Sequence, residues 1–572
     1  MKKFLFLILV IGGFFRYFGI NWDQNQHLHP DERFLTMVTQ SMSWPSSISR
    51  FFDTSSSLVN PHNIGYPFYV YGTLPLFAVK AASQLISLDT YDGNTLVGRF
   101  ISAGLDTLII FLVFLITFRI FKKYPPAIFS ALIYAAAVLP VQLGHFFAVD
   151  TFLVFFITLS FYLLIRLIFS PKTIPLRETI FLGICFGCAM SSKITAALFF
   201  PIILIGFFYR FVLIRKITQI GLITIIFSLT ALISLRILQP YLFVGPVGIN
   251  PQILENWRQL KSFDNPDNAF PPAVQWIKTP AFIFPLANLF FWGWGPVVGI
   301  LVIFSSVFAF KYLKQYPSLL PVLIWVFGLF LYQCLQFAKP MRYFYPIYPF
   351  LAIPAGLCLS LIWKEVKSLP IKIIILIFIL YWPISFISIY SRPHSRVQAS
   401  VWIFQNIPPG STISCEYWDD CLPLSGSDTY RIIQYPLYDP DTSLKWQNME
   451  HRLRETDYLI LSSNRLYASI TSVPEKYPVT SQFYNSLFSG SLGFYKVAEF
   501  TSRPNLPIPG VNFCLTPPLI NYGKIAKTTQ ECTLPGISFV DDYADESWTV
   551  YDHPRILIFK NHESKISSDR IF

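Results

Sequence analysis

The sequence has few charged residues. Only 13% of its 572 residues are Asp, Glu, Lys or Arg, whereas soluble globular proteins carry about a quarter. This scarcity argues against a soluble globular chain. Hydrophobic residues instead reach 53% and aromatic residues 17%. Such a composition predicts a polytopic α-helical membrane protein, because lipid-facing helices need apolar surfaces and aromatic side chains gather at the membrane interface.

Two further absences narrow the class of protein. The chain carries a net charge of +12 but has no basic face and no nucleic-acid motif, so we expect no nucleic-acid partner. The first 20 residues, MKKFLFLILVIGGFFRYFGI, have a basic start and an apolar run, as a signal peptide does. No small-x-small cleavage site follows them, and Arg16 interrupts the run. An uncleaved first span is therefore favoured over a signal peptide.

Apolar stretches predict about eleven membrane spans, since a span needs about 20 mostly apolar residues. They begin near Phe4, Leu96, Ala127, Thr151, Thr179, Ala196, Ile217, Phe282, Ser318, Phe344 and Ile371. Basic clusters occur at every second loop, at Lys2, Lys3, Arg119, Lys122, Lys123, Arg166, Lys172, Arg177, Arg210, Arg215, Lys216, Lys311, Lys314, Lys364, Lys367 and Lys372. Basic loops are cytoplasmic. This predicts a cytoplasmic N-terminus and, with an odd number of spans, an extracytoplasmic C-terminus.

We predict two domains. Residues 1–391 form the transmembrane domain, with a large first outer loop over 21–94 that contains interfacial helices or a twelfth, half-buried element. Beyond them, apolar runs shorten to strand length, as in DYLILSS and RILIFK, which predicts an extracytoplasmic α/β domain over 392–572. Its four cysteines permit two disulfides, and the local pairing is Cys415 with Cys421 and Cys514 with Cys532. Asp419 and Asp420 are expected to be exposed.

The stretch HLHPDERFLTMV, His27 to Val38, follows the first span and is unexpectedly polar. Ionisable groups at the membrane boundary are costly and usually functional. Asp31, with Glu32 beside it, could be a general base, because partial burial raises the pKa of a carboxylate toward the working range. Pro30 followed by two acidic residues is also an ordinary helix start. His29 could assist the reaction, bind a metal or cap the loop.

Other outer segments add charged and aromatic residues. GHFFAVDT places His145 and Asp150 at the start of a span, and MSSKITA places Lys193 between two spans. FAKPMRYFYPIYP adds the further candidates Arg342, Tyr343 and Tyr345. Anchoring at the membrane interface would explain such residues without any site. Together they also predict a cavity that holds an anionic lipid headgroup, with cations on its phosphate and a carboxylate at the reacting carbon.

The Asp-Glu pair after the first span, the His-plus-Asp loop, the lone outer Lys and RYFYPIYP resemble the C-type membrane glycosyltransferases. The resemblance is closest to family 39-like enzymes, which include protein O-mannosyltransferases and the lipid A aminoarabinose transferase. It implies the C-type glycosyltransferase fold and a polyprenyl-phosphate sugar donor. It also implies that an acceptor hydroxyl, on a glycan, lipid or protein, attacks the anomeric carbon with inversion, at the outer face of the plasma (inner) membrane.

The resemblance also assigns roles to residues. Asp31 would be the base, and Glu32 would orient it or bind the acceptor. Asp150 would belong to a second acidic motif, associated with metal or acceptor binding. The phosphate of the donor would contact Lys193, Arg342 and Tyr343. A divalent cation is possible as a cofactor, but no ligand spacing demands one.

Several features depart from the family or leave alternatives open. YGTLPLFAVK, with Lys80, replaces the usual Pro-Pro-Leu stretch of the first outer loop, and no large lumenal domain is inserted. Asp264 and Asp267 lie in a long outer loop that either covers the site or is a solvated turn. A secondary transporter and a non-catalytic membrane scaffold are the alternative functions. The chain has no convincing internal repeat, and its acidic residues gather at one face, which disfavours the transporter.

Overall fold

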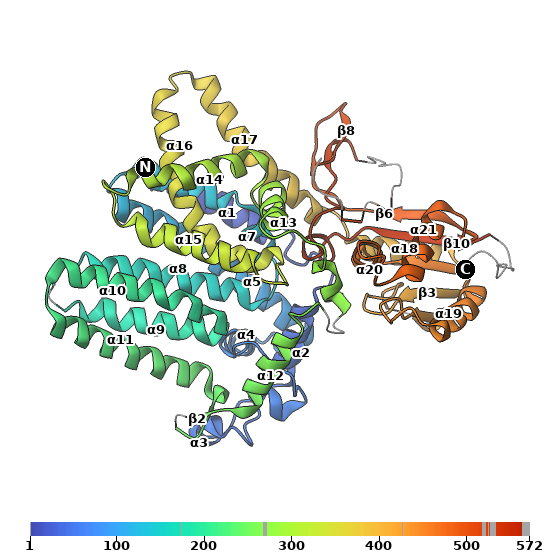
Figure 1. The fold of residues 1–572 in the computed structure, drawn as a ribbon, viewed down its shortest axis with the longest axis horizontal. Helices are drawn as coiled ribbons and strands as arrows, with labels where there is room; N and C mark the ends of the chain where they lie inside the picture. The colour runs from blue at the N-terminus through green and yellow to red at the C-terminus, as the bar shows by residue number, and fades with distance from the viewer. Residues whose placement is uncertain are drawn as a thin grey trace.

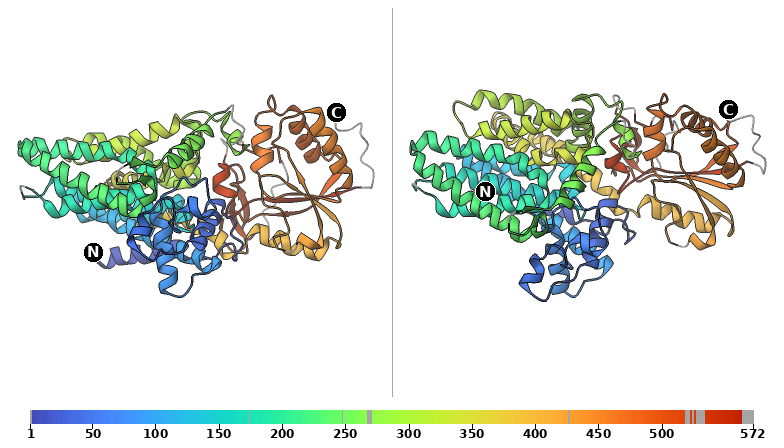
Figure 2. Two further views of the ribbon diagram at one scale, coloured as in Figure 1. Left: turned by 90° about the horizontal axis from the view of Figure 1, so that it is seen from below. Right: turned by 60° about the horizontal axis from the view of Figure 1, so that its bottom comes forward.

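The computed structural model describes residues 2–172, 174–246, 248–266, 271–425, 427–517, 522–523, 525–526 and 534–562. Its first part consists of helices and one short antiparallel pair of strands, β1 (Phe243–Val244) and β2 (Gly248–Ile249). An α/β part lies at one end of the helices (Figures 1 and 2). The helices of the first part are α1 (Lys2–Tyr17), α2 (Pro30–Ser41), α3 (Ile48–Phe52), α4 (Leu74–Leu85), α5 (Tyr91–Phe121), α6 (Tyr124–Ala135), α7 (Val138–Gly144), α8 (Val149–Ile168), α9 (Leu176–Ser192), α10 (Phe200–Ile214), α11 (Ile217–Leu238), α12 (Pro251–Ser262), α13 (Ile283–Asn288), α14 (Pro296–Phe308), α15 (Leu319–Cys334), α16 (Tyr348–Glu365) and α17 (Leu369–Ile387).

Each predicted apolar stretch is helical, but fewer described helices than expected are long enough to count as candidate spans. By length and composition, six helical stretches among the described residues could cross a membrane, or seven if the bent pair α6 and α7 is one span. Three apolar helical stretches are shorter, at Ile283–Trp294, Pro296–Tyr312 and Leu319–Cys334. The count of about eleven is therefore not confirmed. Helix breaks are the physical reason; α9, for example, ends where the backbone becomes extended at Lys193.

The first outer loop is built from short helices rather than from a span. It holds α2, α3 and α4, the short 3₁₀ helix η1 (Pro61–Ile64), and their own apolar core around Leu35, Val38 and Leu76. With 12 residues, α4 is too short to cross a bilayer. The Lys80 side chain on α4 is bound to Asp89 at 2.8 Å. This loop therefore forms a small packed layer against the N-terminal end of α5.

The α/β part is built on a five-stranded sheet in the order β4-β3-β5-β10-β6. The strands are β3 (Thr412–Glu416), β4 (Arg431–Tyr435), β5 (Tyr458–Leu461), β6 (Phe494–Phe500) and β10 (Ile556–Asn561). β3 is parallel to β4 and β5, and β10 is antiparallel to β5 and β6. Helices α18 (Ser395–Asn406), α19 (Ser443–Glu455), α20 (Arg465–Thr471) and α21 (Pro478–Ser489) accompany it. Every residue of β5 is buried, as expected of a central strand.

A second, three-stranded sheet lies beside α17. It has the order β7-β9-β8, from β7 (Asn505–Leu506), β8 (Asn512–Leu515) and β9 (Gly536–Phe539). The ring of Phe539 lies 5.1 Å from that of Trp382 on α17. The chain then runs back along the helical part before it enters β10. We call residues 540–555, which include α22 (Glu546–Thr549), the returning segment. Contacts therefore cross the predicted boundary between residues 391 and 392. The division into two domains at this boundary stays a prediction.

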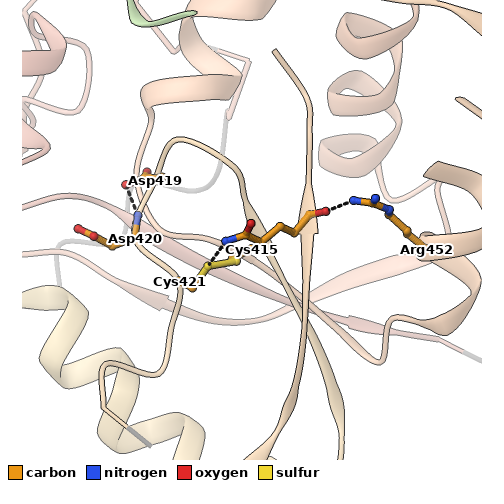
Figure 3. The surroundings of a disulfide bond; sticks show 6 residues. Cys415, Asp419, Asp420, Cys421 and Arg452 are labelled. Atoms are coloured by element: carbon orange, nitrogen blue, oxygen red, sulfur yellow. Dashed lines mark hydrogen bonds between the residues drawn. A yellow bond between two sulfur atoms is a disulfide. The ribbon is translucent and has the colours of Figure 1, made fainter. Parts of the chain in front are cut away.

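One of the two predicted disulfides is confirmed. Cys415, in β3, is bonded to Cys421, and the bond closes the loop that carries Asp419 and Asp420 (Figure 3). The second pairing involves Cys532, which lies outside the described residues. Asp419 is not exposed as expected, because Arg396 on α18 binds it at 2.7 Å and leaves 1% of its side chain accessible. Asp420 keeps 24% of its surface and bonds both Arg396 and Arg33.

Candidate active site

The polar stretch after α1 begins a helix. His29 is the N-cap of α2, and its Nδ1 accepts a hydrogen bond from the Glu32 N–H at 3.3 Å. Pro30 occupies the first helical position, and Asp31 and Glu32 occupy the first turn, where the helix dipole favours negative charge. Burial lowers the pKa of His29 to about 4, despite the neighbouring carboxylate of Asp31. His29 is therefore a neutral cap at physiological pH.

Glu32 points into the protein. Its side chain has no exposed surface, and the Arg99 Nε donates to both carboxylate oxygens at 3.1 Å. The Phe147 N–H donates to Oε2 at 2.6 Å. Arg99 also binds Asp23 at 2.8 Å and lies over the ring of Trp22. This buried network joins α2 to α5 and to the segment that follows α1, so Glu32 holds α2 in place.

Asp31 points the other way, toward a partly open surface. Its carboxylate forms an ion pair with Arg342, which lies in the 3₁₀ helix η7 (Met341–Ile347), and the two side chains are 25% and 21% exposed. Burial raises the pKa of Asp31, but Arg342, together with His29 and Lys193, outweighs it and holds the pKa well below its usual range. Asp31 is therefore ionised in the structure as it stands.

A second ion pair lies beside the first. Lys193, at the end of α9, binds Asp150 in the first turn of α8 at 2.8 Å. The Lys193 Nζ lies 5.0 Å from the centre of the Tyr343 ring, and the Arg342 guanidinium lies 5.8 Å from the same ring. We call Asp31, Asp150, Lys193, Arg342 and Tyr343 the charged cluster. Four separate segments contribute to it, and the sequence predicted each of its members.

Two other predicted site residues lie elsewhere. The His145 ring nitrogens face the carbonyl oxygens of Val141 at 2.7 Å and Phe18 at 3.0 Å, and its ring stacks on Tyr390 at 4.0 Å. His145 therefore ties helix ends together. The Tyr345 hydroxyl donates to Asp106 Oδ1 at 2.5 Å, inside the helical part. Both side chains are buried, and neither joins the charged cluster.

The structure adds residues that the sequence did not single out. A small pocket next to Arg342 is lined partly by the returning segment, through Ser547, Trp548 and Tyr551, and also by His29, Gln142 and Phe146. Arg33 on α2 reaches Asp420 at 3.0 Å and so joins the helix of Asp31 to the α/β part. In the sequence, the adjacent acidic residues Asp419 and Asp420 indicate that a cationic partner could bind here. Nothing in the sequence distinguishes Tyr551 from the other tyrosines, because tyrosine is common in this chain.

The predicted outer-loop acids are placed only in part. Asp264 accepts a hydrogen bond from the Ala338 N–H at 2.9 Å and forms an ion pair with Lys261. It therefore connects the outer loop to the segment just before η7. Asp267 lies outside the described residues.

A divalent cation does not fit the described side chains. Across the described ranges, no three His, Cys, Asp or Glu side chains are grouped so as to hold a metal ion. The two carboxylates of the charged cluster are each paired with a cationic side chain.

Comparison with known proteins identifies the fold. Residues 81–243 match the family model described as dolichyl-phosphate-mannose-protein mannosyltransferase. The archaeal oligosaccharyltransferase AglB from Archaeoglobus fulgidus, solved with an inhibitory peptide and a dolichol-phosphate, is similar at 14% identity, with a TM-score of 0.52 over 86% of this chain and 72% of AglB. The chain has the C-type glycosyltransferase fold. The resemblance seen in the sequence is thereby confirmed at the level of the fold, and the family model supports it over residues 81–243.

Two further matches complete this comparison. The Archaeoglobus fulgidus oligosaccharyltransferase in complex with Zn and sulfate matches at 15% identity and a TM-score of 0.51, over 88% of this chain and 72% of that protein. ArnT from Cupriavidus metallidurans, bound to undecaprenyl phosphate, matches at 14% identity and a TM-score of 0.44, over 87% of this chain and 96% of ArnT. A search of curated protein sequences found no match.

Proposed function

We propose that the protein transfers a sugar from a polyprenyl-phosphate donor to an acceptor hydroxyl, at the outer face of the plasma membrane. The observation that carries the proposal is the charged cluster. It sets two cationic side chains beside a partly exposed carboxylate, where the layer of the first outer loop meets the apolar helices. A lipid phosphate at the membrane boundary can reach such cations. An N-terminus inside and an α/β part outside would give the site this orientation, as the basic loops predict.

Donor binding would activate the base. In the structure Arg342 neutralises Asp31, which makes the carboxylate a weak base. The phosphate of the donor would compete for Arg342 and Lys193, because phosphate oxygens are strong acceptors for both side chains. Once released from Arg342, Asp31 would regain basicity at the moment when the sugar is present. Asp150, paired with Lys193, would orient that ammonium group.

The chemical step is a displacement at the anomeric carbon. The acceptor oxygen forms a bond to this carbon, the bond between the carbon and the phosphate oxygen breaks, and its electron pair leaves with the phosphate. The proton of the acceptor hydroxyl passes to Asp31, and the anomeric configuration inverts. The leaving phosphate is already ionised and needs no general acid, whereas soluble glycosidases use two carboxylic groups. Glu32 would act through the position of α2.

The test is turnover by the purified full-length protein with a panel of polyprenyl-phosphate sugars and mixed glycan, lipid and peptide acceptors. Release of polyprenyl phosphate together with a glycosylated product supports the proposal, and the active donor identifies the sugar. Lys193→Gln should raise the KM for the donor by about tenfold, since it removes one charged contact to phosphate. Lys278→Gln, at an exposed ion pair with Glu475, is the matched control. Substrate-dependent flux in sealed vesicles without any product would favour a transporter instead.

A further inference from the structure

The returning segment is fixed firmly against the helical part beside the charged cluster. Asp545 Oδ2 accepts a hydrogen bond from the Met341 N–H at 2.9 Å, directly before Arg342 in the chain. The Asp545 N–H donates to Asn288 Oδ1 at 2.8 Å. Gln142 on α7 donates to the Trp548 carbonyl at 2.8 Å, and the Trp548 ring is fully buried. These contacts make the segment part of the site's wall.

A buried network of one histidine and two carboxylates holds the end of this segment. His553 lies between two carboxylates, with Nδ1 at 2.5 Å from Asp552 and Nε2 at 2.9 Å from Asp541. Tyr390 also donates to Asp552 at 2.9 Å. The side chains of His553, Asp552 and Asp541 each have at most 1% of their surface exposed. Because Asp552 is held by both His553 and Tyr390, this network restrains the position of Tyr551, the residue directly before Asp552.

Tyr551 lies next to the groups that would bind the donor. Its ring centre is 4.2 Å from that of His29, and it lines the same pocket as Arg342. Its backbone carbonyl faces His394 Nε2 at 3.1 Å, but among the described residues its hydroxyl has no hydrogen-bond partner. Burial raises the pKa of Tyr551 above its usual range, while Arg342 lowers it. The phenol therefore keeps its proton and has a hydrogen bond left to donate.

We propose that Tyr551 is a further catalytic residue, which donates a hydrogen bond to the phosphate of the lipid donor as this phosphate leaves. The inference rests on the proposed function. A polyprenyl-phosphate sugar is a phosphodiester with one negative charge, and breaking the bond to the sugar gives a phosphomonoester with nearly two. A neutral donor fixed beside the leaving oxygens stabilises the growing charge more than the charge of the bound substrate.

This difference predicts which constants change. Tyr551→Phe retains the ring against His29 and removes only the hydroxyl. Loss of a hydrogen bond to a charged group should lower kcat by about ten- to a hundredfold. Binding of polyprenyl phosphate alone, the doubly charged product, should weaken by about tenfold, whereas the KM for the singly charged donor should change by about twofold or less. Replacing a residue that only supports the fold would not lower kcat and product binding while leaving the KM for the donor nearly unchanged.

The experiment compares the full-length wild type with Tyr551→Phe and with Tyr495→Phe, a control on the exposed part of β6. Thermal unfolding checks that all three are equally folded. Weaker binding of polyprenyl phosphate by Tyr551→Phe alone, with a lower kcat, supports the inference. Equal binding and equal kcat in all three proteins overturn it while leaving the proposed function intact. If the wild type neither binds polyprenyl phosphate nor releases it from any donor, the proposed function fails, and the inference fails with it.

Discussion

Replacing Asp31 by Asn should change catalysis and donor binding in opposite directions. Asn has nearly the same shape and can still accept a hydrogen bond from Arg342, but it carries no charge and cannot take a proton from the acceptor. The wild-type carboxylate has two roles, because it is the proposed base and it also competes with the donor phosphate for Arg342. Removing the carboxylate abolishes both the base and the competition.

The magnitudes follow from the geometry of the ion pair. A general base contributes about 10²–10⁴ in rate, so kcat should fall by about a thousandfold. The Asp31 and Arg342 side chains are 25% and 21% exposed, so solvent screens their attraction in part. A pair of this kind contributes about 1 kcal/mol. Without it, the donor should bind about fivefold more tightly, since each 1.4 kcal/mol is a factor of ten.

The assay measures single-turnover rates and donor dissociation constants for both proteins. Asp92→Asn is the matched control, because Asp92 also stands in the first turn of a helix, α5, and its carboxylate contacts His27 rather than an arginine or a lysine among the described residues. A variant that retains the full rate would refute the assignment of the base. A variant that loses the rate and also binds the donor less tightly would refute the competition between Asp31 and phosphate.

Two further predictions concern the buried networks. Glu32→Gln removes a partner of Arg99 that has no exposed surface, so we expect a loss of about 3–5 kcal/mol in unfolding free energy, measured as the shift of the thermal midpoint in detergent. His553 has a pKa raised to about 10 from 6.5, because the carboxylates of Asp552 and Asp541 outweigh burial. Its contribution to stability, of the order of a few kcal/mol, is complete below about pH 6.5 and is lost as the pH rises through about 10. His553→Gln should therefore lower the unfolding midpoint strongly at pH 6 and only slightly at pH 10.5, and an equal loss at both values would contradict a charged imidazole.

The sequence predicted the members of the charged cluster but not their pairing. Residues Asp31 and Arg342 are 311 positions apart, and nothing local indicates that they meet. Local geometry also explains why Tyr343 joins the cluster while Tyr345 does not. Both lie in η7, a 3₁₀ helix, where each residue turns by about 120°. Two residues apart, the side chains therefore point in clearly different directions, a distinction that depends on recognising a 3₁₀ turn.

The number of spans and the role of the α/β part were harder to predict for a different reason. Hydropathy measures apolar length but does not detect where a helix bends, as between α6 and α7 at 57°. The returning segment combines buried acidic residues with Trp548 and Tyr551. From composition alone, its acidic residues would be expected to lie exposed on a soluble domain. Its acids are buried because each finds a partner, some on a distant element, as Asp545 does with the Met341 N–H, and one within the segment, as Asp541 does with His553.

Neighbouring positions on α2 explain how one short helix could hold the proposed base in a fixed position. Successive residues on an α-helix point about 100° apart, so Asp31 and Glu32 face different surroundings. A helix of 12 residues is marginally stable on its own, and a base must be held close to its productive geometry. Glu32 provides this restraint through Arg99, inside the protein and away from the substrate. In the proposed mechanism the paired acidic residues therefore divide two tasks: Glu32 fixes the helix, and Asp31 would exchange Arg342 for a proton.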